Sequence, residues 1–289
     1  MNDELLLTRR RVRRAFERAA PCYDAHAVLQ REIGARMLER LDYVKITPRA
    51  VLDAGSGTGA ALPALRRRYP RSALYALDIA PAMLARARRR VSWWQRLRNR
   101  DVRAVCGDFE QLPLRAAGIG LLWSNLTLQW TITPERAFAE ARRVLEPGGL
   151  FMFSTFGPDT LRELRDAYAG SDDYAHVNRF IDMHDLGDLL VRGGFADPVM
   201  DMEYLTLTYP DVRALLRDLK ALGAHTVIDN RRPTVAPRAL LARVERNYEA
   251  LRRDGRLPAT FEIVYGHAWA PPPRAGPGGR RVIDIRAVP

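Results

Sequence analysis

Short apolar runs alternate with amphipathic segments along most of the chain. Helical segments follow the first, second and fourth of these runs, which indicates βα units. The pattern predicts an α/β fold, with a doubly wound, mostly parallel seven-stranded sheet of the Rossmann-like type. The seven predicted strands occupy residues 50–54, 73–77, 102–106, 119–124, 150–154, 199–208 and 261–269.

Helical patterns also lie before the first strand and between the last three strands. Apolar residues at helical spacing are found at 9–20, 28–41, 160–169, 182–191, 211–222 and 237–251. Helices inserted near the C-terminus are therefore expected to add to the core of βα units. The two helices before the first strand are expected to cover a ligand site as a lid.

We expect a single domain of three parts, followed by a tail. Residues 1–47 form the N-terminal helical lid and residues 48–155 form the ligand-binding core. Residues 156–270 supply helices and the last strands on the substrate side. Residues 271–289 contain Pro-Pro-Pro and Gly-Pro-Gly-Gly and are expected to be a flexible tail.

The first strand runs directly into a glycine-rich turn, Ala54-Gly55-Ser56-Gly57-Thr58-Gly59, and then into a helix. Gly55, Gly57 and Gly59 allow positive φ and lack the Cβ atoms that would keep a ligand away. The helix has Pro63 in its first turn, so its free N–H groups face whatever lies over the glycines. The turn is typical of a nucleotide-binding loop; a structural turn beside solvated acids is the alternative interpretation.

Acids after three successive strands indicate which nucleotide binds. Gly55, Gly57 and Ala60 satisfy the dinucleotide pattern G-x-G-x-x-A, with Asp78 about twenty residues further on. Asp53, however, precedes the loop, where its carboxylate suits an ammonium group that NAD lacks. Asp108 follows the third strand, where it suits an adenine amino group. An ammonium, a ribose diol and an adenine together favour S-adenosylmethionine (SAM) over NAD.

Further residues are expected at the same edge of the sheet, because ligands of open α/β sheets bind at the carboxyl ends of the strands. The predicted cofactor site therefore also includes Ile79, Met83, Phe109, Asn125 and Leu126.

The chain is strongly basic, with 46 Lys and Arg against 34 Asp and Glu and a formal net charge of +12. Such a surface attracts nucleic acid, membranes or an acidic protein. A GC-rich genome would also produce many arginines. Trp93 and Trp94 lie among the arginines between Arg86 and Arg103, a pattern that suits base stacking or an exposed helix end anchored by its tryptophans. No other nucleic-acid motif accompanies it, so a nucleic-acid partner is not expected.

Cysteine content and the chain start indicate a cytoplasmic protein. Cys22 and Cys106 are the only cysteines in the sequence, and Cys106 lies in a strand predicted to be buried. Neither a disulfide framework nor a metal cluster is expected. The start lacks a basic segment followed by a long apolar run, and no apolar run approaches the length of a membrane span.

With these motifs in hand, the chain resembles the class I SAM-dependent methyltransferases and, within them, the malonyl-acyl-carrier-protein O-methyltransferases of biotin synthesis, the BioC family. The glycine loop, Asp78, Asp108-Phe109 and Glu146-Pro147-Gly148-Gly149 carry the general resemblance. The specific resemblance covers about residues 10–270. It rests on Ala15-Phe16 with Ala19-Ala20, Tyr23-Asp24-Ala25-His26-Ala27, Trp123-Ser124-Asn125-Leu126 with Gln129-Trp130, His176-Val177-Asn178-Arg179-Phe180 and Leu219-Lys220-Ala221-Leu222-Gly223-Ala224.

A competing resemblance is to the mitochondrial complex I assembly factor that hydroxylates an arginine. Phe156-Gly157, Asp185-Leu186-Gly187 and Pro258-Ala259-Thr260 are similar to that protein. It shares the SAM fold without evident methyl transfer. The Tyr23 and His-x-Asn-Arg-Phe matches favour the BioC family.

The BioC resemblance implies that Tyr23 and Arg179 bind the substrate carboxylate. From spacing alone, Tyr23 is a lid core aromatic and Arg179 is a surface ion-pair residue, and both interpretations stay open. The implied partner is an acyl-carrier protein bearing malonyl-phosphopantetheine, with malonyl-CoA as a further acceptor and no membrane partner. Candidate contacts for an acidic carrier are the lid arginines from Arg9 to Arg14, and Lys220, Arg231 and Arg232.

Overall fold

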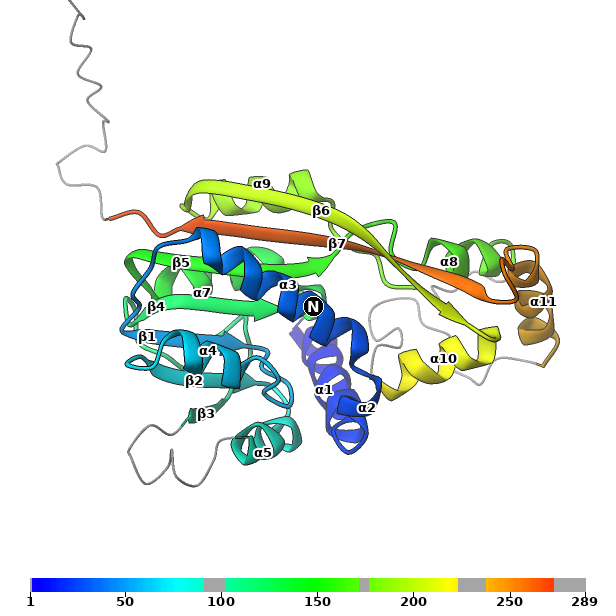
Figure 1. The fold of residues 1–289 in the computed structure, drawn as a ribbon, viewed down its shortest axis with the longest axis horizontal. Helices are drawn as coiled ribbons and strands as arrows, with labels where there is room; N and C mark the ends of the chain where they lie inside the picture. The colour runs from blue at the N-terminus through cyan, green and yellow to red at the C-terminus, as the bar shows by residue number, and fades with distance from the viewer. Residues whose placement is uncertain (1, 91–101, 172–176, 223–237, 273–289) are drawn as a thin grey trace, which may run out of the picture.

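A single seven-stranded sheet forms the centre of the computed structural model, which describes residues 2–90, 102–171, 177–222 and 238–272 (Figure 1). The strand order is β3-β2-β1-β4-β5-β7-β6. Strands β1 to β5 are parallel, and β7 runs antiparallel to both β5 and β6. The strands are β1 (Ala50–Ala54), β2 (Ala73–Asp78), β3 (Val102–Cys106), β4 (Ile119–Asn125), β5 (Leu145–Phe156), β6 (Ala196–Tyr209) and β7 (Leu257–Trp269). The predicted fold is confirmed.

Helices cover both faces of the sheet. The helices are α1 (Asn2–Ala19), α2 (Tyr23–His26), α3 (Val28–Arg40), α4 (Leu62–Arg68), α5 (Pro81–Arg89), α7 (Pro134–Val144), α8 (Arg162–Tyr168), α9 (Met183–Arg192), α10 (Val212–Ala221) and α11 (Arg238–Glu249), with short 3-10 turns η1 (Leu41–Tyr43) and η2 (Leu128–Trp130). One core cluster joins α3, α4 and α5 to β1, β2 and β4. A second cluster joins α7 and α9 to the opposite face.

The register of the central strands brings the predicted site residues to one edge. Asp53 of β1 pairs with Ala76 of β2 and Trp123 of β4. All five residues of β1 are buried, as expected for a central strand covered on both faces. Because β1, β2 and β4 are parallel, Asp78 and Asn125 at the ends of β2 and β4 lie at the same edge of the sheet as Asp53, the last residue but one of β1.

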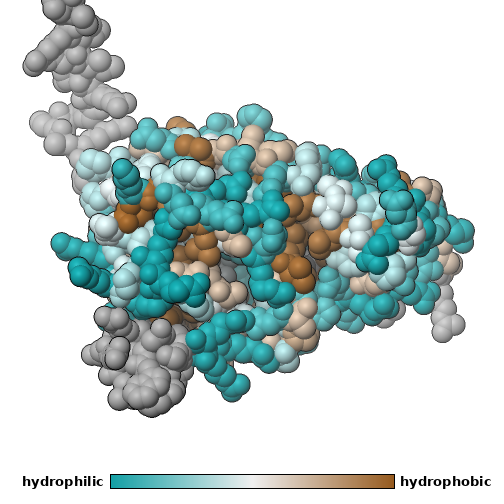
Figure 2. Space-filling view, viewed as in Figure 1, coloured by the Kyte–Doolittle hydropathy of each residue, from teal (hydrophilic) through white to brown (hydrophobic). Residues whose placement is uncertain are grey.

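Strands β6 and β7 form an antiparallel pair that is longer than the apolar pattern predicts. Their pairing runs from Ala196 opposite Trp269 to Tyr209 opposite Leu257. The antiparallel ladder continues past the core because each strand satisfies the other's backbone groups. Helices α8, α10 and α11 lie around its outer end (Figure 1). On the face shown in Figure 2, the surface is mostly hydrophilic, with apolar side chains gathered between α3 and the β6–β7 pair.

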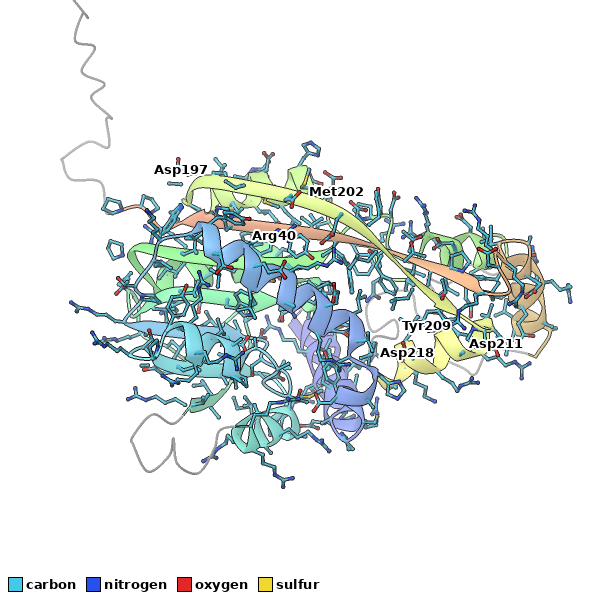
Figure 3. The ribbon with its side chains drawn as sticks, viewed as in Figure 1. Arg40, Asp197, Met202, Tyr209, Asp211 and Asp218 are labelled. Carbon is cyan, nitrogen blue, oxygen red and sulfur yellow. The ribbon has the colours of Figure 1, made fainter. Side chains whose placement is uncertain are left out.

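Charged side chains link helix α3 to strands β6 and β7. Arg40 contacts Asp201 at 2.6 Å and stacks 3.8 Å above the ring of Tyr265. Arg36 pairs with Glu203 of β6. Figure 3 shows Arg40 of α3 below Met202 of β6. These contacts fix α3, the second long helix of the predicted lid, against strands β6 and β7 of the sheet.

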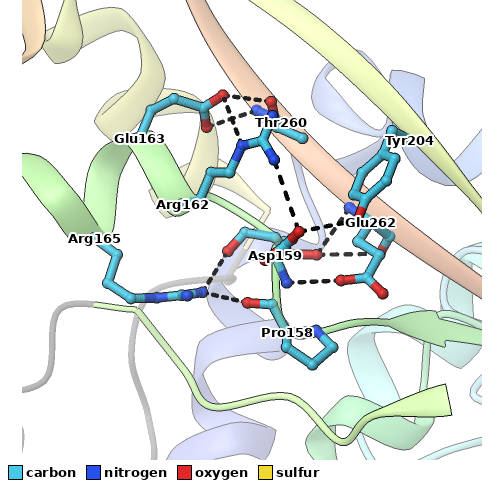
Figure 4. A network of polar contacts seen from close by, with 9 residues as sticks. Pro158, Asp159, Arg162, Glu163, Arg165, Tyr204, Thr260 and Glu262 are labelled. Carbon is cyan, nitrogen blue, oxygen red and sulfur yellow. Dashed lines mark hydrogen bonds and ion pairs between the residues drawn. The ribbon is translucent and has the colours of Figure 1, made fainter. Parts of the chain in front are cut away.

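A buried polar network fixes the loop between β5 and α8 (Figure 4). Glu163 accepts hydrogen bonds from the backbone N–H and the hydroxyl of Thr260, and Glu262 accepts one from the N–H of Asp159 at 2.7 Å. Tyr204 donates to Asp159 at 2.9 Å. Both glutamates are largely buried, so their hydrogen bonds offset the cost of removing charge from water. The loop therefore has a fixed position beside the site.

Three predictions about local structure need correction. Helix α1 begins at Asn2 rather than at residue 9. The fifth strand, predicted at 150–154, begins at Leu145, so Glu146 to Gly149 lie within the bounds of β5, where the pairing with β4 is irregular. The prediction that Cys106 is buried was wrong: Cys106 is exposed, because β3 is an edge strand of the sheet.

The arginine-rich segment lies mostly outside the described residues, as do Trp93, Trp94, Arg231, Arg232, His176 and most of the predicted tail. Within the described ranges, no helix is long and apolar enough to cross a membrane. The same ranges hold no group of three or more side chains able to bind a metal ion. The predicted division into lid, core and substrate side stays a prediction.

Candidate active site

The glycine loop is held by the end of β2. The N–H groups of Gly55 and Ser56 donate to the carbonyl of Leu77 at 2.8 and 2.9 Å. The N–H of Gly57 donates to the Asp78 carboxylate at 2.9 Å. Gly55, Gly57 and Gly59 have φ values of +76°, +53° and +80°, which L side chains rarely adopt. The loop therefore requires glycine for its backbone conformation, as predicted.

The three glycines meet different surroundings. A Cβ added at Gly55 would lie 2.0 Å from the hydroxyl of Thr127, so the loop touches the segment after β4. A Cβ at Gly57 would lie 3.9 Å from the ring of Tyr23. A Cβ at Gly59 would collide with Leu62 and with Ala87 of α5. Gly55 and Gly57 thus face the site, whereas Gly59 packs behind the loop.

Two buried carboxyl groups lie beneath the loop. Oδ2 of Asp53 is buried and has no hydrogen-bond partner among the described residues. Burial raises the pKa of Asp53 to about 8, and the nearby charge of Asp78 adds to this effect. Burial raises the pKa of Asp78 to about 6, although hydrogen bonds from backbone N–H groups oppose the increase. Asp53 is therefore the group that lacks a cationic or donor partner.

The third acid, Asp108, is already paired with the lid. Nε of Arg9 lies 3.0 Å from Asp108, and Nη2 of Arg9 lies 2.6 Å from Glu110. Glu110 is buried and also accepts from the N–H of Thr133 at 3.1 Å. Arg9 was predicted to contact a partner protein; instead it is half-buried, because this side of α1 faces the acid pair. Sequence spacing does not indicate Glu110 as its partner.

A cavity lies over the loop and collects most of the predicted cofactor residues. Its walls include Gly55, Gly57, Asp78, Ile79, Met83, Asp108, Phe109, Asn125 and Leu126. Asp53 lines a hollow that also includes Tyr23 and Asn125. Among the predicted cofactor residues, Gly59 alone is absent from the walls described here.

Several wall residues were not predicted as site residues. Val12 and Phe16 come from α1, Gln30 comes from α3, and Trp130 follows β4. Phe16 and Trp130 meet edge to face, with ring centroids 5.2 Å apart. The amphipathic pattern of α1 places Phe16 on its buried side, which is the one sequence signal that could have found it.

Asn125 is positioned from both sides. Its amide group donates to the carbonyl of Gln30 at 2.9 Å and accepts from the hydroxyl of Ser154 at 2.8 Å. Asn125 therefore links β4 to α3 and β5, and its side chain has one fixed orientation at the wall of the cavity.

Tyr23 lies where the lid meets the glycine loop. It is the first residue of α2 and lines both the main cavity and the hollow at Asp53. Burial raises the pKa of the Tyr23 hydroxyl, and the charges of Asp78 and Asp24 add to this. The hydroxyl therefore stays protonated and is a hydrogen-bond donor.

The structure does not bring Arg179 to Tyr23. Arg179 is exposed, whereas its neighbours Asn178 and Phe180 line a second cavity. This second cavity adjoins the first, because Gln30, Gln129, Trp130, Phe156 and Leu222 line both. The segment around Arg179 is not helical, so adjacent side chains point in different directions.

Known proteins are similar to this chain in sequence and in fold. A family model described as a methyltransferase domain matches residues 52–153. A malonyl-[acyl-carrier protein] O-methyltransferase of Gallionella capsiferriformans is 53% identical, covering 97% of each chain. A protein of the same name from Nitrosospira multiformis is 53% identical, covering 99% of this chain and 97% of its own. The YcgJ protein of Bacillus subtilis shares the fold, with a TM-score of 0.57 at 15% identity over 84% of this chain and 99% of its own.

Proposed function

Because the chain belongs to the malonyl-[acyl-carrier protein] O-methyltransferase family, we propose that it methylates the free carboxylate of a malonyl thioester on acyl-carrier protein, with SAM as methyl donor. In the cell this reaction is an early step of biotin synthesis. The observation that carries the proposal is the cavity over the glycine loop with the adjoining hollow: Asp78 and Asp108 line the cavity, Asp53 lines the hollow, and Tyr23 of the lid lines both.

The residues present fit SAM better than a dinucleotide. Asp53 is buried with an unpartnered oxygen, which suits the ammonium of the methionine part. Asp78 would hold the ribose diol and Asp108 with Phe109 would hold the adenine. When bound, SAM supplies an electrophilic sulfonium methyl group.

The protein has little proton chemistry to perform. A malonyl carboxylate is ionised near neutral pH, so it needs no general base. Tyr23 would donate a hydrogen bond to one carboxylate oxygen and leave a lone pair of the other directed at the methyl group. Arg179 would grip the carboxylate with two parallel N–H groups. Phe16 with the rest of the lid, and Trp130 from the segment after β4, would exclude water from the site.

The partner and the compartment follow from the same chemistry. Carrier proteins are acidic, and the net charge of +12 favours their encounter with this chain. Arg10, Arg11 and Arg14 of α1 and Lys220 of α10 are exposed, which leaves them available to an acidic surface. Malonyl-CoA presents the same acyl arm and is a second acceptor. We propose a cytoplasmic location and no role in binding membranes or nucleic acid.

Affinity for S-adenosylhomocysteine should rise with pH. The ammonium of this product prefers the ionised form of Asp53, whose pKa in the free protein is about 8. Calorimetry should therefore show up to about fifty-fold tighter binding at pH 8 than at pH 6, because the ionised fraction of Asp53 rises from about 1% to about 50%. Both acids hold their protons more tightly in the folded chain, so the ligand-free protein should lose stability as pH rises from about 4 to about 8.

The control for this pH effect is Asp53→Asn. The variant removes the ionisation near pH 8 and leaves that of Asp78, whose pKa is about 6. Its affinity should change little between pH 7 and pH 8. An unaltered pH dependence in Asp53→Asn would show that another group controls binding.

Replacing Asp78 should weaken SAM binding without unfolding the chain. Asp78→Ala should cost roughly 1–3 kcal/mol of binding free energy, because it loses charge-assisted hydrogen bonds. Asp78 also accepts the N–H groups of Gly57 and Ala80, so part of this loss would come from a looser loop. Asp78→Asn separates the two, since its amide oxygen can still accept one backbone bond. Calorimetry with SAM measures both variants.

A comparison of acceptors tests the proposed function. The same carrier protein is loaded with malonyl or with acetyl and incubated with SAM. We expect a methyl ester on the malonyl form alone, since acetyl has no free carboxylate. Equal transfer to both forms, or to neither, would refute the proposal.

A further inference from the structure

The second cavity has features of a binding site that the account above leaves unused. It adjoins the SAM cavity and is mainly apolar, with walls from Leu29, Phe156, Leu161, Leu207, Leu219 and Phe261. Among the described residues that line it, His26 is the only one able to carry a positive charge. An anionic group that entered this cavity would therefore have one cationic partner in the wall.

His26 is held by two residues from distant parts of the chain. Its Nδ1 lies 2.7 Å from Oδ1 of Asp218 on α10. The hydroxyl of Tyr209, at the end of β6, donates to Oδ2 of Asp218 at 2.9 Å. Figure 3 shows Tyr209 and Asp218 facing each other where β6 ends and α10 lies. Both oxygens of Asp218 are thus engaged, which fixes the carboxylate and, through it, the imidazole ring.

This arrangement determines what the other ring nitrogen can do. A carboxylate acceptor at Nδ1 orients the ring and favours a proton on that nitrogen. Nε2 of His26 has no hydrogen-bond partner among the described residues. When the ring carries both protons, Nε2 is a charge-assisted donor for a ligand.

His26 also lies on the same short helix as Tyr23. The two residues are three apart on α2, so they share one side of its single turn. Tyr23 lines the SAM cavity and His26 lines the second one. A small anion between the two cavities would lie within reach of both side chains.

Polar groups in the wall also indicate the rest of the ligand. Oε1 of Gln30 and Oδ1 of Asn178 are buried without hydrogen-bond donors among the described residues. A buried acceptor without a donor costs roughly 1–3 kcal/mol. A ligand with amide N–H groups on a flexible arm, such as phosphopantetheine, could supply those donors after small side-chain rotations.

From these contacts we propose that the second cavity is the acyl site and that His26, positioned by Asp218 and Tyr209, binds the carboxylate of the malonyl group. This inference rests on the proposed function and adds to Arg179 a second cation that selects malonyl over uncharged acyl groups. The apolar wall receives the arm, while Tyr23 and His26 approach the anion from two sides. Asp218 and Tyr209 act through His26 and are positioning residues.

A purely structural role for the same contacts predicts a different result. The His26 to Asp218 pair also joins α2 of the lid to α10, so its loss could loosen the lid. A looser lid would weaken the binding of every acyl group alike. Loss of a carboxylate contact would weaken the binding of malonyl-carrier protein and leave the binding of acetyl-carrier protein unchanged.

The test measures the affinity of one carrier protein loaded with malonyl or with acetyl, in the presence of S-adenosylhomocysteine. In the unaltered protein we expect malonyl to bind more tightly. In His26→Gln this preference should fall by about ten- to a hundred-fold, the loss expected for one charge-assisted hydrogen bond. Affinity for acetyl-carrier protein and for S-adenosylhomocysteine should stay unchanged. Tyr209→Phe should reduce the preference less, because Asp218 keeps its contact with His26.

Two results would overturn the inference. If His26→Gln keeps the malonyl preference, or weakens malonyl and acetyl equally, His26 does not bind the carboxylate. With either result, the proposed function still stands as long as the unaltered protein methylates the malonyl carrier. A protein that neither prefers nor methylates the malonyl form would remove the proposed function and this inference together.

Discussion

Gly55→Ala should abolish binding of SAM and S-adenosylhomocysteine. Gly55 has a φ of +76°, and a Cβ there would lie 2.0 Å from the hydroxyl and 2.4 Å from the methyl group of Thr127. The left-handed backbone costs an alanine roughly 1–2 kcal/mol, and the collision adds roughly 1–3 kcal/mol. Either the loop or Thr127 must move to relieve the collision. We expect calorimetry to show a loss of affinity of at least about a hundred-fold.

Gly255→Ala is the matched control for Gly55→Ala. Gly255 has a φ of +73°, and a Cβ there would meet nothing within 4 Å. It carries the same backbone strain without the collision and lies far from the glycine loop in sequence. Its ligand affinity should equal that of the unaltered protein. If Gly55→Ala resembles Gly255→Ala in thermal stability and affinity, the loop does not form the cofactor site.

Arg179→Ala should lower methyl transfer at saturating SAM by about ten- to a hundred-fold, with SAM affinity unchanged. The expected loss is that of one bidentate, charge-assisted contact with the malonyl carboxylate. Arg179 is exposed and does not line the second cavity, whereas its neighbours Asn178 and Phe180 do, so this variant tests a role inferred from the family resemblance. Arg179→Lys should restore only part of the rate, because an ammonium lacks the planar pair of donors.

Tyr23→Phe is the companion variant, since it deletes the hydroxyl and keeps the ring against Gly57. A lower rate with unchanged thermal stability would assign the hydrogen bond rather than the packing. A fully active Tyr23→Phe, together with an Arg179→Ala that loses activity only in step with stability, would make both residues structural. The carboxylate would then depend on other groups, such as His26.

The positions of the three acids could be predicted because each follows a strand that is apolar enough to recognise. Parallel strands end at one edge of the sheet, so Asp53, Asp78 and Asp108 had to lie together once the strands were found. The glycine loop was equally readable, since alternating glycines between a strand and a helix have few other uses. The SAM cavity is therefore largely a consequence of local patterns.

The second cavity could not be predicted in the same way. His26, Tyr209 and Asp218 meet across more than 180 residues of chain, and no local period links them. The pairing of Arg9 with Glu110 likewise depends on how α1 lies across the sheet. Spacing does not distinguish the exposed Arg179 from the wall residues Asn178 and Phe180, because side-chain direction in an irregular segment depends on tertiary packing.

The intact mass of malonyl-carrier protein, measured after incubation with the enzyme and SAM, tests the central claim most directly. The account predicts the mass increase of one methyl ester, dependent on SAM and absent from acetyl-carrier protein. An unchanged malonyl carrier, despite SAM binding, would contradict it. So would a gain of one oxygen on an arginine of a protein substrate in place of the methyl ester.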